Sequence, residues 1–389
     1  MKTINDISLQ DKRVLIREDF NVPLESGHIR NDARIRAALP TIEAVFSQGA
    51  QSILLMSHLG RPKEGLFEKS LSLLPVAKHL EELTGRKVHF FTSIEDVEPL
   101  PNGALGLIEN IRFCKGEKNN DETLARQLAG LCDVFVMDAF GAAHRAHAST
   151  YGVAEYAPQV CAGLLLEKEV NALTQVLEAP KRPLVAIIGG AKVSSKLAVL
   201  GSLLDTVDYL IVGGGMANTF LAARGFSVGA SLMEPDLIDS AKDLLRKAEE
   251  NNKQIILPSD VVVATDLSES AMTRVVSIDE IRVDEAIFDV GPKSITEINT
   301  CIKEAGTILW NGPLGVFECQ PFSAGTAALT EAVKSAKGFS FAGGGDTLAA
   351  IAQFSAESGI DYISTGGGAF LEWVEEGSLP CVDIIREKS

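Results

Sequence analysis

The chain has 389 residues, which is more than one hydrophobic core usually organises and therefore predicts two domains. Hydrophobic residues make up 46% of the chain and charged residues 23%, which is the composition of a folded protein and argues against disorder. The formal net charge of −16 disfavours binding to nucleic acid or to an anionic membrane, because both would repel the chain as a whole. A cluster of arginines and lysines in turns is therefore more informative here than in a basic protein.

Cysteine spacing and hydropathy predict a cytoplasmic protein. The six cysteines include no Cys-x-x-Cys pair, so neither a zinc knuckle nor a dithiol redox motif is indicated, and reduced thiols are expected. Residues Met1–Asp11 lack the apolar core of a secretory leader. The longest apolar stretch, Tyr209–Ala223, falls short of the roughly 20 residues that span a bilayer. We therefore expect no membrane span.

Short apolar runs typical of buried strands alternate with helical stretches from one end of the chain to the other. The strands expected in the first half are Val14–Arg17, Ser52–Met56, Leu105–Glu109 and Asp133–Met137. Those expected in the second half are Leu184–Ile188, Tyr209–Val212, Ile255–Leu257, Thr307–Trp310, Phe339–Ala342 and Tyr362–Ser364. Helices are expected between them, for example over Asp236–Asn251 and Ser323–Ser335. This alternation predicts an α/β fold with parallel sheets flanked by helices, which bind ligands at the carboxyl ends of the strands.

The boundary between the two domains is expected near Leu164–Leu177, which has the pattern of a single helix. The segment Glu178–Pro183 contains two prolines and predicts a turn before the next strand. The expected domains are therefore residues 1–170 and 171–374. A helix that joins two domains is a plausible hinge, because the ends of an element can absorb a rotation.

Glycines gather where four strands of the second half end. The segments are Ile187–Lys192, Gly213–Met216, Gly343–Thr347 and Gly366–Ala369. Glycine lets backbone N–H groups approach a ligand closely, and the helix that follows each turn adds unpaired donors and the positive end of its dipole. A single turn of this kind often serves only to connect a strand to a helix. Four of them on one sheet edge predict a polyphosphate site.

Familiar nucleotide motifs are absent from the sequence. It contains no G-x-x-x-x-G-K-[ST] loop, no G-x-G-x-x-G after a strand and no protein-kinase motif set. Lys192 and Lys196 are four residues apart, so they would share one helix face if a helix began after Gly190, although lysines are more commonly just solvated. Asp346 could be a Mg²⁺ ligand or a simple N-cap, and its spacing leaves both roles open.

Arginines and histidines recur where the strands of the first half end. The segments are Arg17–Pro23, Ser57–Pro62, Asn110–Phe113 and Asp138–Arg145, and Arg34 lies in a charged stretch after the first of them. Arginine recognises phosphate and carboxylate with two parallel hydrogen bonds. A lone histidine such as His58 or His144 is often only structural. In so acidic a chain, however, this concentration predicts a basic patch for an anionic ligand.

The segment Arg13–Pro23 resembles the signature segment of the phosphoglycerate kinase family. Further segments resemble family motifs in the family's order over the whole chain: Ser57–Pro62, Asp138–Arg145, Gly189–Lys196, Trp310–Glu318, Gly343–Thr347 and Ser364–Ala369. The resemblance implies a monomeric kinase of glycolysis and gluconeogenesis with two Rossmann-like domains. Such an enzyme transfers a phosphoryl group reversibly from 1,3-bisphosphoglycerate to ADP, giving 3-phosphoglycerate and ATP, with Mg²⁺ accompanying the nucleotide.

The resemblance also implies roles for individual residues. The phosphoglycerate would be bound by Asp19, Asn21, Arg34, His58, Leu59, Gly60, Arg61, Arg112 and Arg145. The nucleotide would be bound by Lys192, Lys196, Gly213, Gly214, Asn311, Pro313, Val316, Glu318, Gly344, Gly345, Asp346 and Thr347. Arg34 and Lys192 would be catalytic, and Asp346 would hold Mg²⁺. The tail, residues 375–389, would fold back onto the N-terminal domain.

Transfer from an acyl phosphate requires no general base, because the attacking oxygen is already ionised at neutral pH. Catalysis must then come from in-line positioning, from neutralisation of charge and from exclusion of water, which two closing lobes would provide.

Two other classes of protein explain parts of the pattern. A two-lobed binding protein accounts for the hinge and the basic patch but predicts no Mg²⁺ ligand such as Asp346. A nicotinamide-dependent dehydrogenase accounts for the α/β domains but predicts the dinucleotide glycine fingerprint, which the sequence lacks.

Overall fold

The structure is a computed structural model that describes residues 1–25 and 27–388, and its chain divides into two compact units. Unit 1 comprises Met1–Asn171 together with the described residues from Glu376 onward, and unit 2 comprises Ala172–Glu375. The division falls inside helix α5 (Leu164–Leu177), the segment in which the sequence predicts the boundary.

Unit 1 is built on a parallel sheet whose strands lie in the order β5-β6-β4-β1-β7-β8. The bounds are β1 (Arg13–Arg17), β4 (Ser52–Met56), β5 (Val88–Phe91), β6 (Ala104–Ile108), β7 (Val134–Met137) and β8 (Val160–Ala162). The four inner strands are the apolar runs that the sequence predicts, and β4 and β7 are buried along their whole length. The sequence does not predict the two edge strands, because β8 is very short and β5 contains His89 and is only partly buried.

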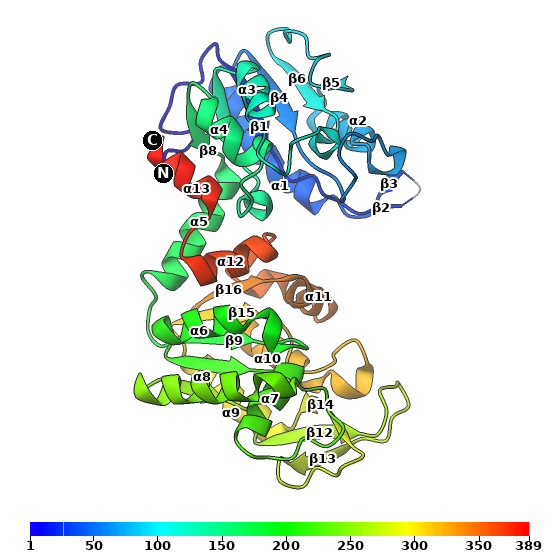
Figure 1. The fold of residues 1–389 in the computed structure, drawn as a ribbon, viewed down its shortest axis with the longest axis vertical. Helices are drawn as coiled ribbons and strands as arrows, with labels where there is room; N and C mark the ends of the chain where they lie inside the picture. The colour runs from blue at the N-terminus through cyan, green and yellow to red at the C-terminus, as the bar shows by residue number, and fades with distance from the viewer. Residues whose placement is uncertain (26, 389) are drawn as a thin grey trace. The chain divides into compact units, whose positions relative to one another are not determined.

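Helices cover this sheet (Figure 1). Their bounds are α1 (Ala33–Ser47), α2 (Leu74–Thr84), α3 (Glu122–Gly130), α4 (Val153–Tyr156) and α13 (Pro380–Glu387), and short turns η1 (Lys69–Leu71), η2 (Ile111–Phe113), η3 (Phe140–Ala142) and η4 (Ala148–Gly152) lie in the connections. A small hairpin, β2 (Leu24–Glu25) and β3 (His28–Ile29), precedes α1. The core contains Ile16 and Leu55 of the sheet with Ile35 of α1 and Val76 of α2.

The last helix, α13, packs within unit 1 although it is the final element of the chain. It contacts α4, η4 and β8, beside which it lies in Figure 1. Val382 and Ile385 on this helix are completely buried, and the N–H of Cys381 donates to the carbonyl of Ala143 at 3.1 Å. The chain therefore returns to the unit in which it began.

Unit 2 contains a second parallel sheet, with strands in the order β11-β10-β9-β15-β16-β17. The bounds are β9 (Leu184–Ile188), β10 (Tyr209–Val212), β11 (Gln254–Ile256), β15 (Thr307–Asn311), β16 (Phe339–Gly343) and β17 (Tyr362–Ser364). The helices of this unit are α6 (Leu197–Thr206), α7 (Gly215–Ala223), α8 (Ile238–Glu250), α9 (Pro292–Glu304), α10 (Ala324–Lys334), α11 (Gly345–Gln353) and α12 (Gly368–Glu376). The core packs Ile187 and Trp310 of the sheet against Ile302 of α9 and Leu329 of α10.

A separate antiparallel sheet in unit 2, in the order β13-β12-β14, was not predicted from the sequence. Its strands are β12 (Asp260–Ala264), β13 (Arg274–Ser277) and β14 (Ala286–Val290). β13 is mostly exposed and β14 is only partly buried, so neither has the continuous apolar run of an inner parallel strand. The prediction of an α/β fold with two parallel sheets is confirmed, and this small sheet is an addition to it.

Among the described residues, no helix combines the length and the apolar character needed to cross a bilayer. Both parallel sheets align the carboxyl ends of their strands along one edge. The residues that follow those strands are therefore brought together, and they form the candidate site in each unit.

Candidate functional site

Asp19, Asn21 and Arg34 form a hydrogen-bonded group at the carboxyl end of β1. The carboxylate of Asp19 accepts from Nη1 of Arg34 at 2.8 Å and from the N–H of Asn21 at 3.0 Å. The same Nη1 of Arg34 lies 3.3 Å from the carbonyl of Asn21. The Arg34 side chain is 34% exposed and that of Asp19 11%, so the carboxylate orients a guanidinium that solvent still reaches.

The loop after β4 is tied to this group through Gly60. The N–H of Gly60 donates to Oδ1 of Asn21 at 2.9 Å, and its carbonyl accepts from Nη1 of Arg112. Gly60 has φ of +62°, and a Cβ there would lie 2.6 Å from Cδ2 of Leu71. A side chain at this position would therefore be strained and crowded, which explains the glycine.

Arg112 belongs to η2, directly after β6, and it is a buried cation with an unsatisfied donor. Its Nε has no hydrogen-bond partner among the described residues. Burial, followed by the charges of Arg145 and Arg17, lowers the pKa of Arg112 to about 10, so the guanidinium stays charged at neutral pH. A buried unpaired donor of this kind is costly unless a ligand satisfies it.

Asn110 was not assigned from the sequence, although it holds the same loop in place. Its side-chain amide makes two hydrogen bonds to the backbone of Leu59: Nδ2 donates to the Leu59 carbonyl at 2.7 Å, and Oδ1 accepts from the Leu59 N–H at 3.2 Å. Oδ1 also accepts from the N–H of Arg112 at 3.1 Å. An asparagine immediately after a buried strand and before Arg112 is the sequence signal that indicates this role.

The histidines near these arginines are held neutral. Burial, followed by the charges of Arg17, Arg112 and Arg145, holds the pKa of His58 well below its usual value. Nε2 of His144 accepts from Nε of Arg145 at 2.9 Å, and burial followed by Arg145 lowers the pKa of His144 to about 4. The positive charge of this surface therefore comes from its arginines.

We call this surface the basic patch, and its members share a position after a strand of unit 1 or in the first turn of α1: Arg34, His58, Arg61, Arg112 and Arg145. Arg61 is exposed and makes no hydrogen bond or ion pair to a described residue. All the phosphoglycerate residues predicted from the sequence lie at this edge of the unit 1 sheet or in the adjoining loops.

In unit 2 the predicted glycine turns follow β9, β10, β16 and β17, and helical structure resumes after each of them. Gly214 shows why glycine is needed there. It has φ of +65°, and a Cβ would lie 2.7 Å from the carbonyl oxygen of Gly190 in the neighbouring turn. Its N–H donates to the carbonyl of Leu314 at 2.9 Å, which joins the turn after β10 to the segment after β15.

Lys192 and Lys196 do not share a helix face, so this sequence expectation is wrong. A short 3₁₀ turn, η5 (Val193–Ser195), separates them, and α6 begins only at Leu197. Lys192 precedes the turn in an extended conformation. A 3₁₀ turn has about three residues per turn instead of 3.6, so the four-residue spacing no longer aligns the two side chains.

The two lysines also differ in environment. The Lys192 side chain is exposed, and its amine makes no hydrogen bond or ion pair to a described residue. The amine of Lys196 donates to the carbonyl of Gly189 at 2.7 Å and to the side-chain oxygen of Asn311. Burial lowers the pKa of Lys196 to about 8, although the charge of Asp346 opposes the shift.

A pocket of about 260 Å³ lies beside Lys196 and the N-termini of α11 and α12. The residues that line it are Lys196, Asn311, Gly312, Gly344, Gly345, Asp346, Thr347, Gly367, Gly368 and Leu371. Asp346 is exposed and makes no hydrogen bond to a described residue, and the N-cap of α11 is Gly344. The capping role left open by the sequence is therefore not the role of Asp346.

Thr347 is buried, and its hydroxyl is already used within unit 2. It accepts from the N–H of Gly312 at 2.7 Å and donates to the carbonyl of Gly343 at 2.8 Å. A ligand would therefore meet the backbone of this helix N-terminus before it met the Thr347 hydroxyl. Asn311 is similarly committed, because its Nδ2 donates to the carbonyl of Gly343 at 2.7 Å.

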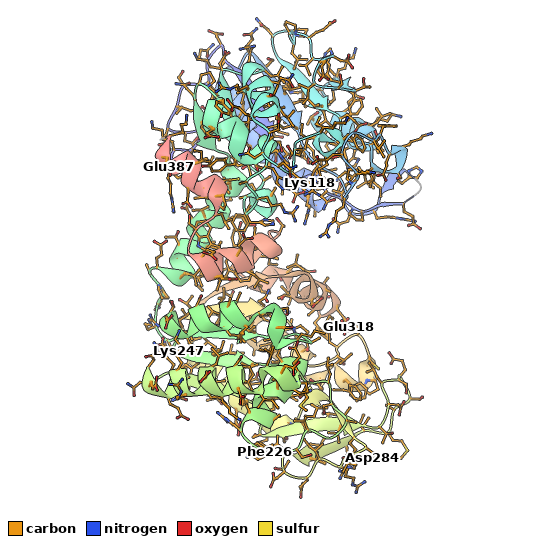
Figure 2. All side chains as sticks on the ribbon, viewed as in Figure 1. Lys118, Phe226, Lys247, Asp284, Glu318 and Glu387 are labelled. Carbon is orange, nitrogen blue, oxygen red and sulfur yellow. The ribbon has the colours of Figure 1, made fainter. Side chains whose placement is uncertain are left out.

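A narrow apolar cleft lies next to the turn after β10. Its walls include Gly214, Phe288, Leu314 and Val316, and it encloses about 30 Å³. Small-molecule sites usually enclose about 300–1,000 Å³, so this cleft is much smaller than such a site. Glu318 lies on the surface of unit 2 (Figure 2).

Comparison with known proteins identifies relatives over the whole chain. The family model described as phosphoglycerate kinase matches residues 4–377. A protein named phosphoglycerate kinase from Legionella pneumophila (strain Lens) is 53% identical to this chain, and the match covers 99% of this chain and 97% of the relative. One from Francisella philomiragia is 51% identical, and the match covers 100% of this chain and 98% of the relative. The solved structure of phosphoglycerate kinase from Coxiella burnetii is 50% identical with a TM-score of 0.95, covering 99% of each chain. That of the enzyme from Pyrococcus horikoshii is 30% identical with a TM-score of 0.83, covering 100% of this chain and 99% of the other.

The environment of Lys196 predicts that nucleotide binding weakens in mild alkali. The amine is protonated below about pH 8 in the free protein, and a bound phosphate would raise its pKa further. Affinity for ADP should therefore be constant below that pH and fall about five-fold between pH 8 and pH 9, as protons are lost from the free protein but not from the complex. Calorimetric titration of ADP across this range measures the effect.

The matched control is Lys196→Arg, which keeps a positive charge throughout the range because arginine does not deprotonate in proteins. Its ADP affinity should show no such decline. An equal decline in both proteins would assign the effect to another group.

Proposed function

The chain belongs to the phosphoglycerate kinase family, and on that premise we propose how its residues divide the work of the reaction. The enzyme is a phosphotransferase that moves a phosphoryl group reversibly from 1,3-bisphosphoglycerate to ADP, giving 3-phosphoglycerate and ATP in glycolysis and, in reverse, in gluconeogenesis. The proposed division rests on a difference between the two sheet edges. Unit 1 gathers arginines there, and unit 2 gathers glycine turns, lysines and a free carboxylate.

The basic patch binds the phosphoglycerate in this proposal. The unpaired Nε of Arg112 supports the assignment, because it offers a donor to an anion, and so does the guanidinium of Arg34, whose side chain is 34% exposed and carries positive charge. Asn21 and Gly60, linked by their hydrogen bond, would set the position of the substrate backbone relative to these charges. The histidines nearby contribute hydrogen bonds and no charge, so the attraction for the substrate does not depend on their titration.

The glycine turns and lysines of unit 2 bind the nucleotide. The exposed Lys192 would reach the phosphoryl group in transfer, and the half-buried Lys196 would neutralise charge on the phosphates already held in the pocket. Backbone N–H groups at the N-termini of α11 and α12 add donors and the positive ends of their dipoles. The adenosine group is assigned to the cleft beside Gly213, Gly214, Pro313 and Val316, with Glu318 on the ribose.

Asp346 fits a magnesium site. Its carboxylate has no hydrogen bond to a described residue and it lines the pocket assigned to the phosphates. Mg²⁺ in nucleotide sites is commonly held by one or two carboxylates together with phosphate oxygens, and it neutralises charge between those oxygens. Asp346 would thus hold the ion that accompanies the nucleotide.

The protein groups act by positioning and by charge. The attacking oxygen of ADP or of the 3-phosphoglycerate carboxylate is ionised at neutral pH, so no side chain has to remove a proton. Arg34 from unit 1 and Lys192 from unit 2 would donate to the oxygens of the phosphoryl group in transfer, where negative charge must be balanced. Asp19 contributes by holding Arg34 in the required orientation.

The two units must act on the same pair of reactants. Every residue assigned to the phosphoglycerate belongs to unit 1, and every residue assigned to the nucleotide belongs to unit 2. Reacting atoms have to come within about 3–3.5 Å of each other, and water has to be excluded from an acyl phosphate. The units therefore approach each other during catalysis, and α5, the helix that connects them in the chain, takes part of the rotation. The enzyme acts as a monomer in the cytoplasm in this proposal.

Arg34→Ala tests the catalytic role proposed for Arg34. Loss of a donor to the transferring group should lower turnover by about 10²–10³-fold, which corresponds to about 2.7–4 kcal/mol of transition-state stabilisation. A coupled assay of ATP- and Mg²⁺-dependent consumption of 3-phosphoglycerate measures it. Arg36→Ala is the matched control on the same helix, because Arg36 is exposed and forms an ion pair with Asp32, and this variant should stay near the wild-type rate. Near-normal turnover of folded Arg34→Ala would remove Arg34 from the catalytic role.

Asp346→Asn should weaken binding of Mg²⁺–nucleotide and leave phosphoglycerate binding intact. Loss of a charged ligand is expected to cost about 1.5–3 kcal/mol, or roughly ten- to a hundred-fold in affinity. Calorimetry with each ligand alone separates the two effects. Asp239→Asn, an exposed change in the same unit, serves as control and should alter neither affinity. If Asp346→Asn lost affinity equally for both ligands, the assignment of the two ligands to different units would be contradicted.

Closure predicts a change of size in solution. Substrate and nucleotide together should compact the enzyme more than either does alone, because closure draws the cationic residues of unit 1 toward phosphates bound by unit 2 and so gives each ligand a preference for the closed form. Small-angle scattering of the free, single-ligand and ternary states measures the radius of gyration. An unchanged radius in all of them, with enzyme that turns over, would require an active site that is already assembled without closure.

A further inference from the structure

A chain of buried polar groups lies behind the basic patch, and it centres on Arg17. This arginine is the last residue of β1, and its side chain is 1% exposed. Its Nη2 lies 3.2 Å from Nδ1 of His58, its Nε lies 3.1 Å from Oγ of Ser149, and its Nη1 donates to the carbonyl of Glu18. None of the roles assigned above uses Arg17.

The direction of each hydrogen bond in this chain follows from the chemistry of its members. Arginine has donors and no acceptor, so Nδ1 of His58 must accept from Arg17, and Oγ of Ser149 must accept as well. The Ser149 hydroxyl is then free to donate to Oε1 of Glu117 at 2.5 Å, while the Ser149 N–H donates to Oε2 at 2.9 Å. These hydrogen bonds link the completely buried carboxylate of Glu117 to Ser149, Ser149 to Arg17, and Arg17 to His58 of the basic patch.

An accepting Nδ1 determines where the proton of a neutral imidazole lies. One ring nitrogen accepts and the other carries the hydrogen, so the proton of His58 must be on Nε2. Nε2 itself has no hydrogen bond to a described residue. It is therefore left as a donor that a ligand can use.

We propose that Arg17 is a positioning residue that keeps His58 in the neutral tautomer with its proton on Nε2, so that His58 presents a hydrogen-bond donor to the phosphoglycerate. The proposal rests on the proposed function to the extent that His58 contacts that substrate. With the proton on Nδ1, the ring would point a lone pair at an anion and a second hydrogen at the guanidinium of Arg17. Both contacts would be repulsive.

The charges around His58 act in the same direction. Burial is the main cause of the lowered pKa of His58, and the positive charges of Arg17 of β1, Arg112 of η2, Arg145 and Arg34 of α1 lower it further. An imidazolium at this position would be a further buried cation among arginines, whereas a neutral Nε2–H donor costs nothing in charge repulsion. Glu117 is the buried anion that balances Arg17, because the two interact electrostatically and share Ser149.

The tautomer can be measured directly in the free protein. In protein labelled with ¹⁵N in its histidine rings, NMR correlation of ring nitrogens with ring carbon-bound hydrogens distinguishes a protonated nitrogen from an accepting one. We expect Nδ1 of His58 to be unprotonated and Nε2 to be protonated, with no titration as the pH is lowered from about 8 through the ordinary histidine pKa of about 6.5. A proton on Nδ1, or titration at that ordinary value, would overturn the proposal.

Variants at position 17 separate positioning from a purely structural role. Arg17→Met removes the donor and its charge, so His58 should populate both tautomers. KM for 3-phosphoglycerate should then rise about ten-fold while KM for ATP stays unchanged. Arg17→Lys retains a cationic donor and should restore the Nε2–H tautomer. Ser149→Ala is the matched control, since it breaks the link to Glu117 and leaves the bond between Arg17 and His58. An unchanged tautomer in folded Arg17→Met would overturn the proposal.

The tautomer of His58 and the kinase activity are tested by separate measurements. The spectrum of the wild-type protein determines the tautomer even if Arg17→Met does not fold. Because that spectrum is recorded without substrate, its result is independent of the coupled assay that tests the proposed function. An active enzyme whose His58 carries its proton on Nδ1 would leave the kinase assignment intact and would refute the role of Arg17.

Discussion

Parallel pairing of strands is the constraint on which the remainder of this structure depends. In each unit all strands of the main sheet run in one direction, so every strand delivers the residues that follow it to the same edge. In unit 1 this brings Asn21 after β1 into contact with Gly60 after β4, and Gly60 into contact with Arg112 after β6. In unit 2 it brings the turns after β9 and β10 together, so that Gly214 and Gly190 nearly touch. The chemistry of both edges follows from that alignment.

Positive charge in so acidic a chain has to be held in place, and the arginines of this structure are held by hydrogen bonds that they donate to polar neighbours. Arg34 is oriented by Asp19, and Arg112 by the carbonyl of Gly60. The buried Arg17 is balanced by Glu117 through Ser149. Since the nearby histidines remain neutral, the charge presented to a substrate is carried by guanidinium groups, which do not titrate near neutral pH.

In the proposed function the two units use different means to bind phosphate groups. Unit 1 uses side-chain cations, which recognise an anion with directional pairs of hydrogen bonds. Unit 2 relies more on backbone N–H groups at helix N-termini, together with Lys196 in the pocket wall. Division of a reaction between two units lets each ligand bind by itself, and it makes the transfer step depend on both being present.

Much of this protein was determined by its sequence alone. The inner strands of both sheets are continuous apolar runs, and the glycine turns that follow them were located correctly, because burial on both faces and close backbone approach leave local signals. Family membership followed from motifs in order along the chain. The tertiary structure decided the edge strands of unit 1, the small antiparallel sheet and the separation of Lys192 from Lys196 by a 3₁₀ turn. It also decided that Asn110 hydrogen-bonds to the backbone of Leu59. Arg17 likewise contacts His58, which is 41 residues away in the sequence, and Ser149, which is 132 residues away. The physical reason is that hydropathy and turn residues report local geometry, whereas the partner of a buried donor depends on which distant segments the sheet brings together.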